Sequence, residues 1–134
     1  MSVVGSYDEI TGAQQTGFFR HEGRRVAYAV VGEGPPLVLP AWWVSNIAED
    51  WKREKFRRFV EALARERRVI RYDRLGCGLS DRGRPAETMT IDFEADLLAA
   101  LLDELELDRV SFFGSSCGGP TAITFAVRSL IRVR

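Results

Sequence analysis

The sequence contains only two cysteines and one histidine among its 134 residues. Both cysteines, Cys77 and Cys117, stand in glycine-rich turns. Residues 1–15 show no positively charged segment followed by an apolar one, which is the pattern of an export signal. Two thiols without such a signal predict free cysteines in a reducing compartment rather than a disulfide, and we therefore expect a cytoplasmic protein.

The sequence also lacks an excess of charge and a long apolar run. Nineteen basic residues balance nineteen acidic ones, so no net field attracts nucleic acid or an anionic membrane. No apolar run approaches the roughly 18 residues that a membrane-spanning helix requires. We therefore expect neither nucleic acid nor a membrane as a partner.

The length allows one domain at most. Residues 1–15 are polar and have no apolar period, and we expect a loose leader there, followed by a single domain over 16–134. Extended and amphipathic segments alternate in that domain. The expected strands are 16–22 and 24–31, joined as a hairpin, then 37–39, 68–72 and 110–113, and the expected helices are about 48–67, 91–105 and 119–130. This order predicts an α/β fold with a mostly parallel sheet and helices on both faces.

The helix expected at 91–105 has both a capping residue and an apolar stripe. Thr90 can cap its first turn, and Asp92 and Glu94 there suit the positive end of the helix dipole. The apolar residues that recur at helical spacing predict its buried stripe: Phe93, Leu97, Leu101 and Leu105.

The chemistry concentrates in residues 108–120, DRVSFFGSSCGGP. An apolar run ends in G-x-S-x-G, and an apolar segment of helical length follows, which is the context of a nucleophile elbow. The register makes Ser116 the candidate nucleophile and the Cys117 backbone N–H a candidate oxyanion donor, while Gly114 and Gly118 permit close packing. The alternative is a turn of small residues without a catalytic role.

Three stretches together resemble the α/β-hydrolase fold family. They are LVLPAW at 37–42, YDRLGCGLS at 72–80 and GSSCGG at 114–119. The first looks like the strand and oxyanion loop, the second like the glycine turn after the next strand, and the third like the elbow. The first two stretches are also similar to a bacterial subset found beside or fused to nucleotide-cyclase or transcription-regulator domains.

The resemblance implies a small-molecule substrate, no metal and no cofactor. It makes Ser116 the nucleophile and the backbone N–H groups of Cys117 and Trp42 the oxyanion hole. Pro40 has no N–H and cannot be a donor. We expect either Trp42 or Trp43 to form a pocket wall, because a loop with two indoles seldom leaves both exposed.

The rest of a catalytic triad is missing from the sequence. In this family the acid and the histidine follow the serine, but residues 117–134 contain no Asp, Glu or His. The single histidine, His21, falls on the first hairpin, several strands from the elbow, and we expect a strand-surface residue. Asp73 and Asp81 flank a glycine turn, where carboxylates usually brace the loop.

These observations predict the N-terminal part of a hydrolase-like protein, a truncated α/β-hydrolase fold that ends after the elbow helix. The outer edge of the elbow strand is then expected to lack a partner and to favour self-association. Three readings stay open: part of a serine hydrolase acting on a small ester or amide, part of a non-catalytic small-molecule sensor, and a short self-associating protein. Each reading that involves hydrolysis leaves the isolated chain inactive, because the general base is absent.

Overall fold

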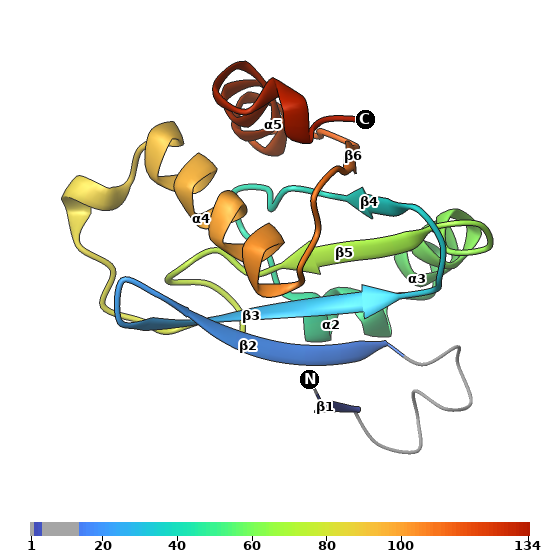
Figure 1. Cartoon of the computed structure of the whole chain (residues 1–134). Helices are drawn as coiled ribbons and strands as arrows, with labels where there is room; N and C mark the ends of the chain where they lie inside the picture. The colour runs from blue at the N-terminus through green and yellow to red at the C-terminus, as the bar shows by residue number, and fades with distance from the viewer. Residues whose placement is uncertain (1, 4–13) are drawn as a thin grey trace.

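A mixed sheet of six strands lies at the centre of the computed structural model, which describes residues 2–3 and 14–134 (Figure 1). The strands are β1 (Ser2–Val3), β2 (Gln15–His21), β3 (Arg24–Val31), β4 (Pro36–Val38), β5 (Arg68–Tyr72) and β6 (Ser111–Phe112). Their spatial order is β1-β2-β3-β5-β4-β6. Parallel pairing joins β4 to β5 and to β6, whereas the pairings of β1 with β2, β2 with β3 and β3 with β5 are antiparallel.

This arrangement confirms the α/β class and the N-terminal hairpin, and it places β4 between β5 and β6. The hairpin closes through Glu22 and Gly23, with φ of 50° and 78°, which is the positive-φ pair that a two-residue turn of the favoured hand requires. Most of the leader expected at 1–15 lies outside the described residues. Within the described part, β1 pairs with β2 and the Gln14 side chain is buried.

The helices are α2 (Ile47–Lys52), α3 (Glu54–Leu63), α4 (Ile91–Glu104) and α5 (Gly118–Arg128), with 3-10 turns η1 (Ala86–Thr88) and η2 (Leu130–Arg132), over the described part of the chain. The expectation of one helix over 48–67 is wrong. The backbone is extended at Arg53, with ψ of 112°, and its N–H donates to the Asp50 carbonyl to end α2. The apolar period used for the prediction falls within α3, so it carried no information about the preceding turn.

Alternate residues of the strands supply the two faces of the core, as the period of two in a strand requires. Val38 and Ile70 pack with the leucines of α4 and with Phe125 of α5. Leu37 and Val69, one residue earlier, belong to the opposite cluster with residues of α2 and α3. Helices therefore cover both faces of the sheet, as predicted, and Figure 1 shows α4 and α5 on the side away from α2.

The outer edge of the elbow strand differs from the expectation. Val110 forms a parallel bridge with Val133, in which the Val110 N–H donates to the Arg132 carbonyl and the Arg134 N–H donates to the Val110 carbonyl, both at 2.9 Å. The prediction of a wholly unpaired edge is therefore wrong at Val110. It failed because α5 ends at Arg128, two residues earlier than expected, and this leaves enough chain to return to the strand. Among the described strands, Ser111–Phe112 pair with β4 alone.

Candidate active site

The turn between β6 and α5 holds Ser116 in the left-handed region, with φ of 53°. A strained, positive φ is the conformation expected of the serine in a nucleophile elbow. Such a conformation costs about 1–3 kcal/mol for a residue other than glycine, and the surrounding structure must maintain it. Two backbone hydrogen bonds do so: the Gly118 N–H donates to the Ser115 carbonyl at 2.9 Å and the Gly119 N–H to the Ser116 carbonyl at 3.1 Å. Ser116 itself is exposed.

The two glycines of the G-x-S-x-G pattern are required by close backbone contacts. A Cβ on Gly114 would lie 2.9 Å from the Gly119 Cα, and a Cβ on Gly118 would lie 2.4 Å from the Pro40 carbonyl oxygen. The first contact packs the strand end against α5. The second packs the loop that follows β4 against the first turn of α5, so the structure brings the 40–42 loop to the elbow.

Further contacts hold this loop in place. The Cys117 thiol lies 3.9 Å from the Ala41 carbonyl oxygen, and the Ala41 backbone hydrogen-bonds to the fully buried Tyr72 hydroxyl. Burial raises the pKa of Tyr72 well above its ordinary range, so the phenol stays neutral. Ala41, the neighbour of Trp42 in the loop, therefore contacts Cys117, whose backbone N–H is the other candidate oxyanion donor. We predict that the Trp42 and Cys117 backbone nitrogens lie within about 6 Å of each other, because each donor must reach one oxygen at roughly 3 Å.

Asp73 braces the glycine turn, as expected, and does not face the elbow. Its carboxylate is fully buried and accepts hydrogen bonds from the backbone N–H groups of Ile47 and Leu79, each at 2.9 Å. Burial raises the pKa of Asp73, and these hydrogen bonds oppose part of that rise. A Cβ on Gly78 would lie 2.0 Å from the Asp73 carboxylate, so the turn closes around this side chain.

Asp81 and His21 also lie apart from the elbow. Asp81 accepts a hydrogen bond from the Arg25 N–H at 2.8 Å and ties the glycine turn to β3. His21 ends β2, and its ring meets the Phe93 ring edge-on with centroids 5.4 Å apart. Four strand spacings separate β2 from β6, or about 19 Å across the sheet. The structure therefore does not bring His21 to Ser116.

The two indoles of the loop have different environments. Trp42 is half-buried and meets Phe56 edge-on at 5.7 Å. Trp43 is 62% exposed, and the Arg74 guanidinium lies over its ring at 5.1 Å from the centroid. Trp43 forms a wall of one hollow along the loop, and Trp42 borders a smaller one.

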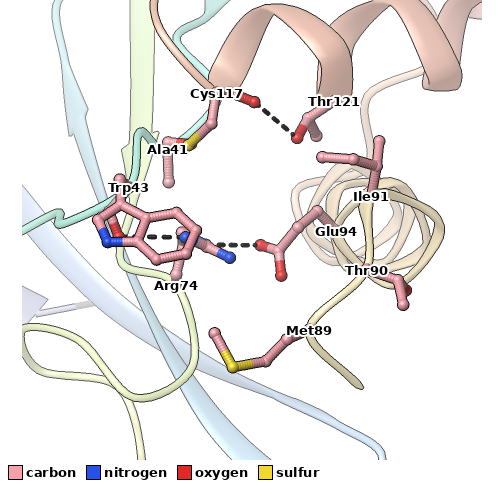
Figure 2. Close-up of a pocket in the computed structure, with 9 residues that line it drawn as sticks. All are labelled: Ala41, Trp43, Arg74, Met89, Thr90, Ile91, Glu94, Cys117 and Thr121. Carbon is pink, nitrogen blue, oxygen red and sulfur yellow. Dashed lines mark hydrogen bonds and ion pairs between the residues drawn. The ribbon is translucent and has the colours of Figure 1, made fainter. Parts of the chain in front are cut away.

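That wall belongs to a cavity of about 120 Å³ beside the elbow (Figure 2). Its lining residues come from the 40–42 loop and its extension, the glycine turn, α4 with its preceding segment, and α5: Ala41, Trp43, Arg74, Met89, Thr90, Ile91, Glu94, Cys117 and Thr121. Cys117 represents the elbow in this set, and Ser116 is its neighbour in the chain. A small molecule in the cavity would therefore lie next to the elbow.

A buried group of three charges forms one side of the cavity. Glu94 pairs with Arg74, at 3.3 Å between Nε and Oε1, and with Arg84 through its other oxygen. All three side chains are less than a tenth exposed. From the sequence, Glu94 was expected only to interact with the helix dipole. The missed signal is that Glu94 shares a helix face with Leu98 and Leu101, at i+4 and i+7, so its carboxylate is carried into the interior.

Residues 2–3 and 14–134 are the part of the chain that the structure describes. That part of the chain has no group of three or more His, Cys, Asp or Glu side chains placed to hold a metal ion. No helix within it is both long and apolar enough to cross a membrane.

Known proteins with similar sequences and structures share this fold. The alpha/beta hydrolase fold family matches residues 40–134. The chain is 38% identical over 104 residues to the 2-hydroxy-6-oxo-2,4-heptadienoate hydrolase of Pseudomonas putida, and the match covers 78% of this chain and 36% of that protein. It is 32% identical over 114 residues to haloalkane dehalogenase 2 of Mycobacterium tuberculosis, again covering 36% of the relative.

Solved structures show the same fold. A hydrolase from Pseudomonas aeruginosa superposes with a TM-score of 0.76 at 28% identity, covering 89% of this chain and 43% of that structure. The epoxide hydrolase VrEH1 of Vigna radiata has the same TM-score at 19% identity, covering 90% and 37%. The chain thus spans less than half the length of these proteins.

Proposed function

The chain belongs to the alpha/beta hydrolase fold family, and on that basis we propose that it carries the nucleophile and the oxyanion hole of a serine hydrolase that cleaves a small ester or amide. The observation that carries the proposal is the left-handed φ of 53° at Ser116, at the turn from β6 into α5. A strained serine at a strand-to-helix turn presents its hydroxyl at the start of a helix, where developing negative charge is stabilised.

In the proposed reaction the Ser116 Oγ attacks the carbonyl carbon of the substrate and its proton passes to a base. The carbonyl oxygen becomes an oxyanion, which the backbone N–H groups of Cys117 and Trp42 stabilise. Collapse of the tetrahedral intermediate expels the alcohol or amine and leaves the acyl group on Oγ, from which water releases it. Removing one such oxyanion donor typically slows the reaction about 100- to 1000-fold.

The described residues do not supply the base near Ser116, since His21 lies about four strand spacings away. We therefore expect the 134-residue chain to show almost no turnover of nitrophenyl acetate. The test joins the chain to the part of the Pseudomonas putida relative that lies C-terminal to the matched segment, where the family's acid and histidine are expected. The folded chimera should hydrolyse the ester, and Ser116→Ala should abolish the activity while Ser115→Ala retains it. A folded chimera as inactive as the chain alone would contradict the proposal.

The same separation of His21 from the elbow favours a second candidate, a small-molecule sensor that binds without turnover. A ligand that shifts the melting temperature of the chimera and is recovered unchanged would support the sensor. We also propose a cytoplasmic location, which the two free cysteines, Cys77 and Cys117, support.

A further inference from the structure

The three charges beside the elbow do not balance. Arg74 and Arg84 both point at the single carboxylate of Glu94, and arginine stays protonated in proteins. The other buried carboxylate of the region, Asp73, faces Arg71 and accepts hydrogen bonds from the backbone N–H groups of Ile47, at the start of α2, and Leu79, in the glycine turn. The wall of the cavity therefore carries one positive charge in excess, and burying an excess charge is unfavourable unless something compensates it.

Arg74 also has donors that the chain leaves unused. Its Nε donates to Glu94 and its Nη1 to the Trp43 carbonyl oxygen at 3.1 Å, whereas its Nη2 has no acceptor among the described residues. The side chain is 91% buried. Figure 2 shows the guanidinium on the cavity wall between Trp43 and Glu94. Arg84, in contrast, has all three of its nitrogens engaged, by Glu94, Thr88 and the Leu75 carbonyl.

The rest of the cavity is small and mostly apolar, with Thr90, Thr121 and Cys117 as its other polar side chains. Ala41, Met89 and Ile91 line it together with the Trp43 ring. Its volume of about 120 Å³ is close to that of an engineered cavity of about 150 Å³ that holds benzene. One ring-sized apolar group fits this space, and a single negative charge matches the excess.

We propose that this cavity is a binding site for a small organic monocarboxylate, with the carboxylate on the Nη2 edge of Arg74 and the apolar body against Met89 and Ile91. Where the proposed function holds, this makes the substrate an ester or amide with a free carboxylate on the side of the molecule away from the elbow. The binding itself does not depend on turnover.

Titration calorimetry on the 134-residue chain tests the site with benzoate and with benzamide, its neutral counterpart of the same shape. A hydrogen bond to a charged group is worth about 1.5–3 kcal/mol, so benzoate should bind about 10- to 100-fold more tightly than benzamide. Equal affinities, tighter binding of benzamide, or no binding of benzoate would each overturn the site.

Variants locate the effect. Arg74→Gln should weaken benzoate binding about 10- to 100-fold, and Glu94→Gln, which adds to the positive excess, should strengthen it about tenfold. The matched control is Arg82→Gln, because Arg82 is an exposed arginine of the same segment that donates to the Gly78 carbonyl and is not a lining residue; it should leave the affinity unchanged. Weaker binding in Glu94→Gln, or an equal loss in Arg82→Gln, would refute the site.

Circular dichroism shows whether each variant folds. If Arg74→Gln does not fold, the affinity of Glu94→Gln for benzoate tests the site. If neither variant folds, the site is tested by comparing the affinities of the unmodified chain for benzoate and benzamide. These experiments measure reversible binding, whereas the test of the nucleophile measures turnover. A negative result for the carboxylate site therefore does not contradict the role of Ser116, and a negative result for Ser116 does not contradict the carboxylate site.

Discussion

At the elbow, two adjacent glycines have opposite surroundings. A Cβ on Gly118 would meet the Pro40 carbonyl oxygen at 2.4 Å, whereas a Cβ on Gly119 has nothing within 4 Å. We expect Gly118→Ala to lower the free energy of unfolding by about 1–3 kcal/mol, because the backbone of the 40–42 loop must move. Gly119→Ala, as the matched control, should raise it by about 0.5–1 kcal/mol, since alanine is favoured over glycine in a helix. Urea unfolding measures both, and equal effects would contradict the contact.

The buried Asp73 makes a pH-dependent contribution to stability. Burial raises its pKa above the ordinary 3.8, so the folded state holds the proton more tightly than the unfolded state. The contribution is fully present below about pH 3.8 and is lost as the pH rises through the raised pKa. Asp73→Asn cannot titrate, and the wild-type stability relative to this variant should therefore fall as the pH increases over that window. A relative stability that rises instead would contradict the direction of the shift.

Single residues of the site differ in how far the sequence could predict them. Ser116 and its positive φ follow from a local pattern, because glycines at fixed offsets define the turn. The charge cluster of Arg74, Arg84 and Glu94 could not be predicted in this way, since up to 20 residues separate its members in sequence. Only the packing of α4 over the glycine turn brings them together.

At the scale of elements, the apolar pattern predicted α4 and the separate strands. It did not predict helix ends that are set by backbone hydrogen bonds. The break at Arg53 between α2 and α3 has no signature in the apolar pattern of 56–63. The return of the chain to Val110 is likewise set by where α5 ends. The break at Arg53 and the end of α5 both depend on backbone conformation, about which the spacing of apolar side chains carries no information.

The pairing of Val110 with Val133 covers part of the elbow-strand edge. Removing residues 130–134 deletes both hydrogen bonds to Val110, so the edge of β6 becomes available to a second copy. At equal concentration, we expect the shortened chain to self-associate more than the full chain. This increase is expected even though the deletion removes the exposed apolar side chains of Leu130 and Ile131. Sedimentation velocity over a concentration series measures this. Unchanged association would show that the edge is not the contact surface.

At the scale of the whole molecule, α5 and η2 expose a group of large apolar side chains. Ile123, Val127, Leu130 and Ile131 are 66–83% exposed. Apolar patches of this kind on a monomer bind hydrophobic dyes, and we expect anilinonaphthalene sulfonate to fluoresce with the native chain. Val127→Glu should reduce the signal without changing the secondary structure. A monomer that unfolds cooperatively and binds no dye would contradict this expectation.

The fold as a whole was predictable because each of its parts is local: a hairpin signal, strands of alternating face and helices of regular period. The chain supplies the elbow and the loop opposite it, and it spans 36–43% of the compared hydrolases. Its excess positive charge beside the elbow arises only from the assembled molecule. The proposed recognition of a carboxylate and the proposed attack by Ser116 are thus separate properties, and each can be tested without the other.

The role of Ser116 as the nucleophile is tested by the position of covalent modification in the chimera with the Pseudomonas putida segment. After reaction with a fluorophosphonate, peptide mapping by mass spectrometry should find the adduct on Ser116. Ser116→Ala should remain unlabelled, and Ser115→Ala should label as the unmodified chimera does. An adduct on Ser115, or labelling that persists in Ser116→Ala, would contradict the assignment of Ser116 as the nucleophile.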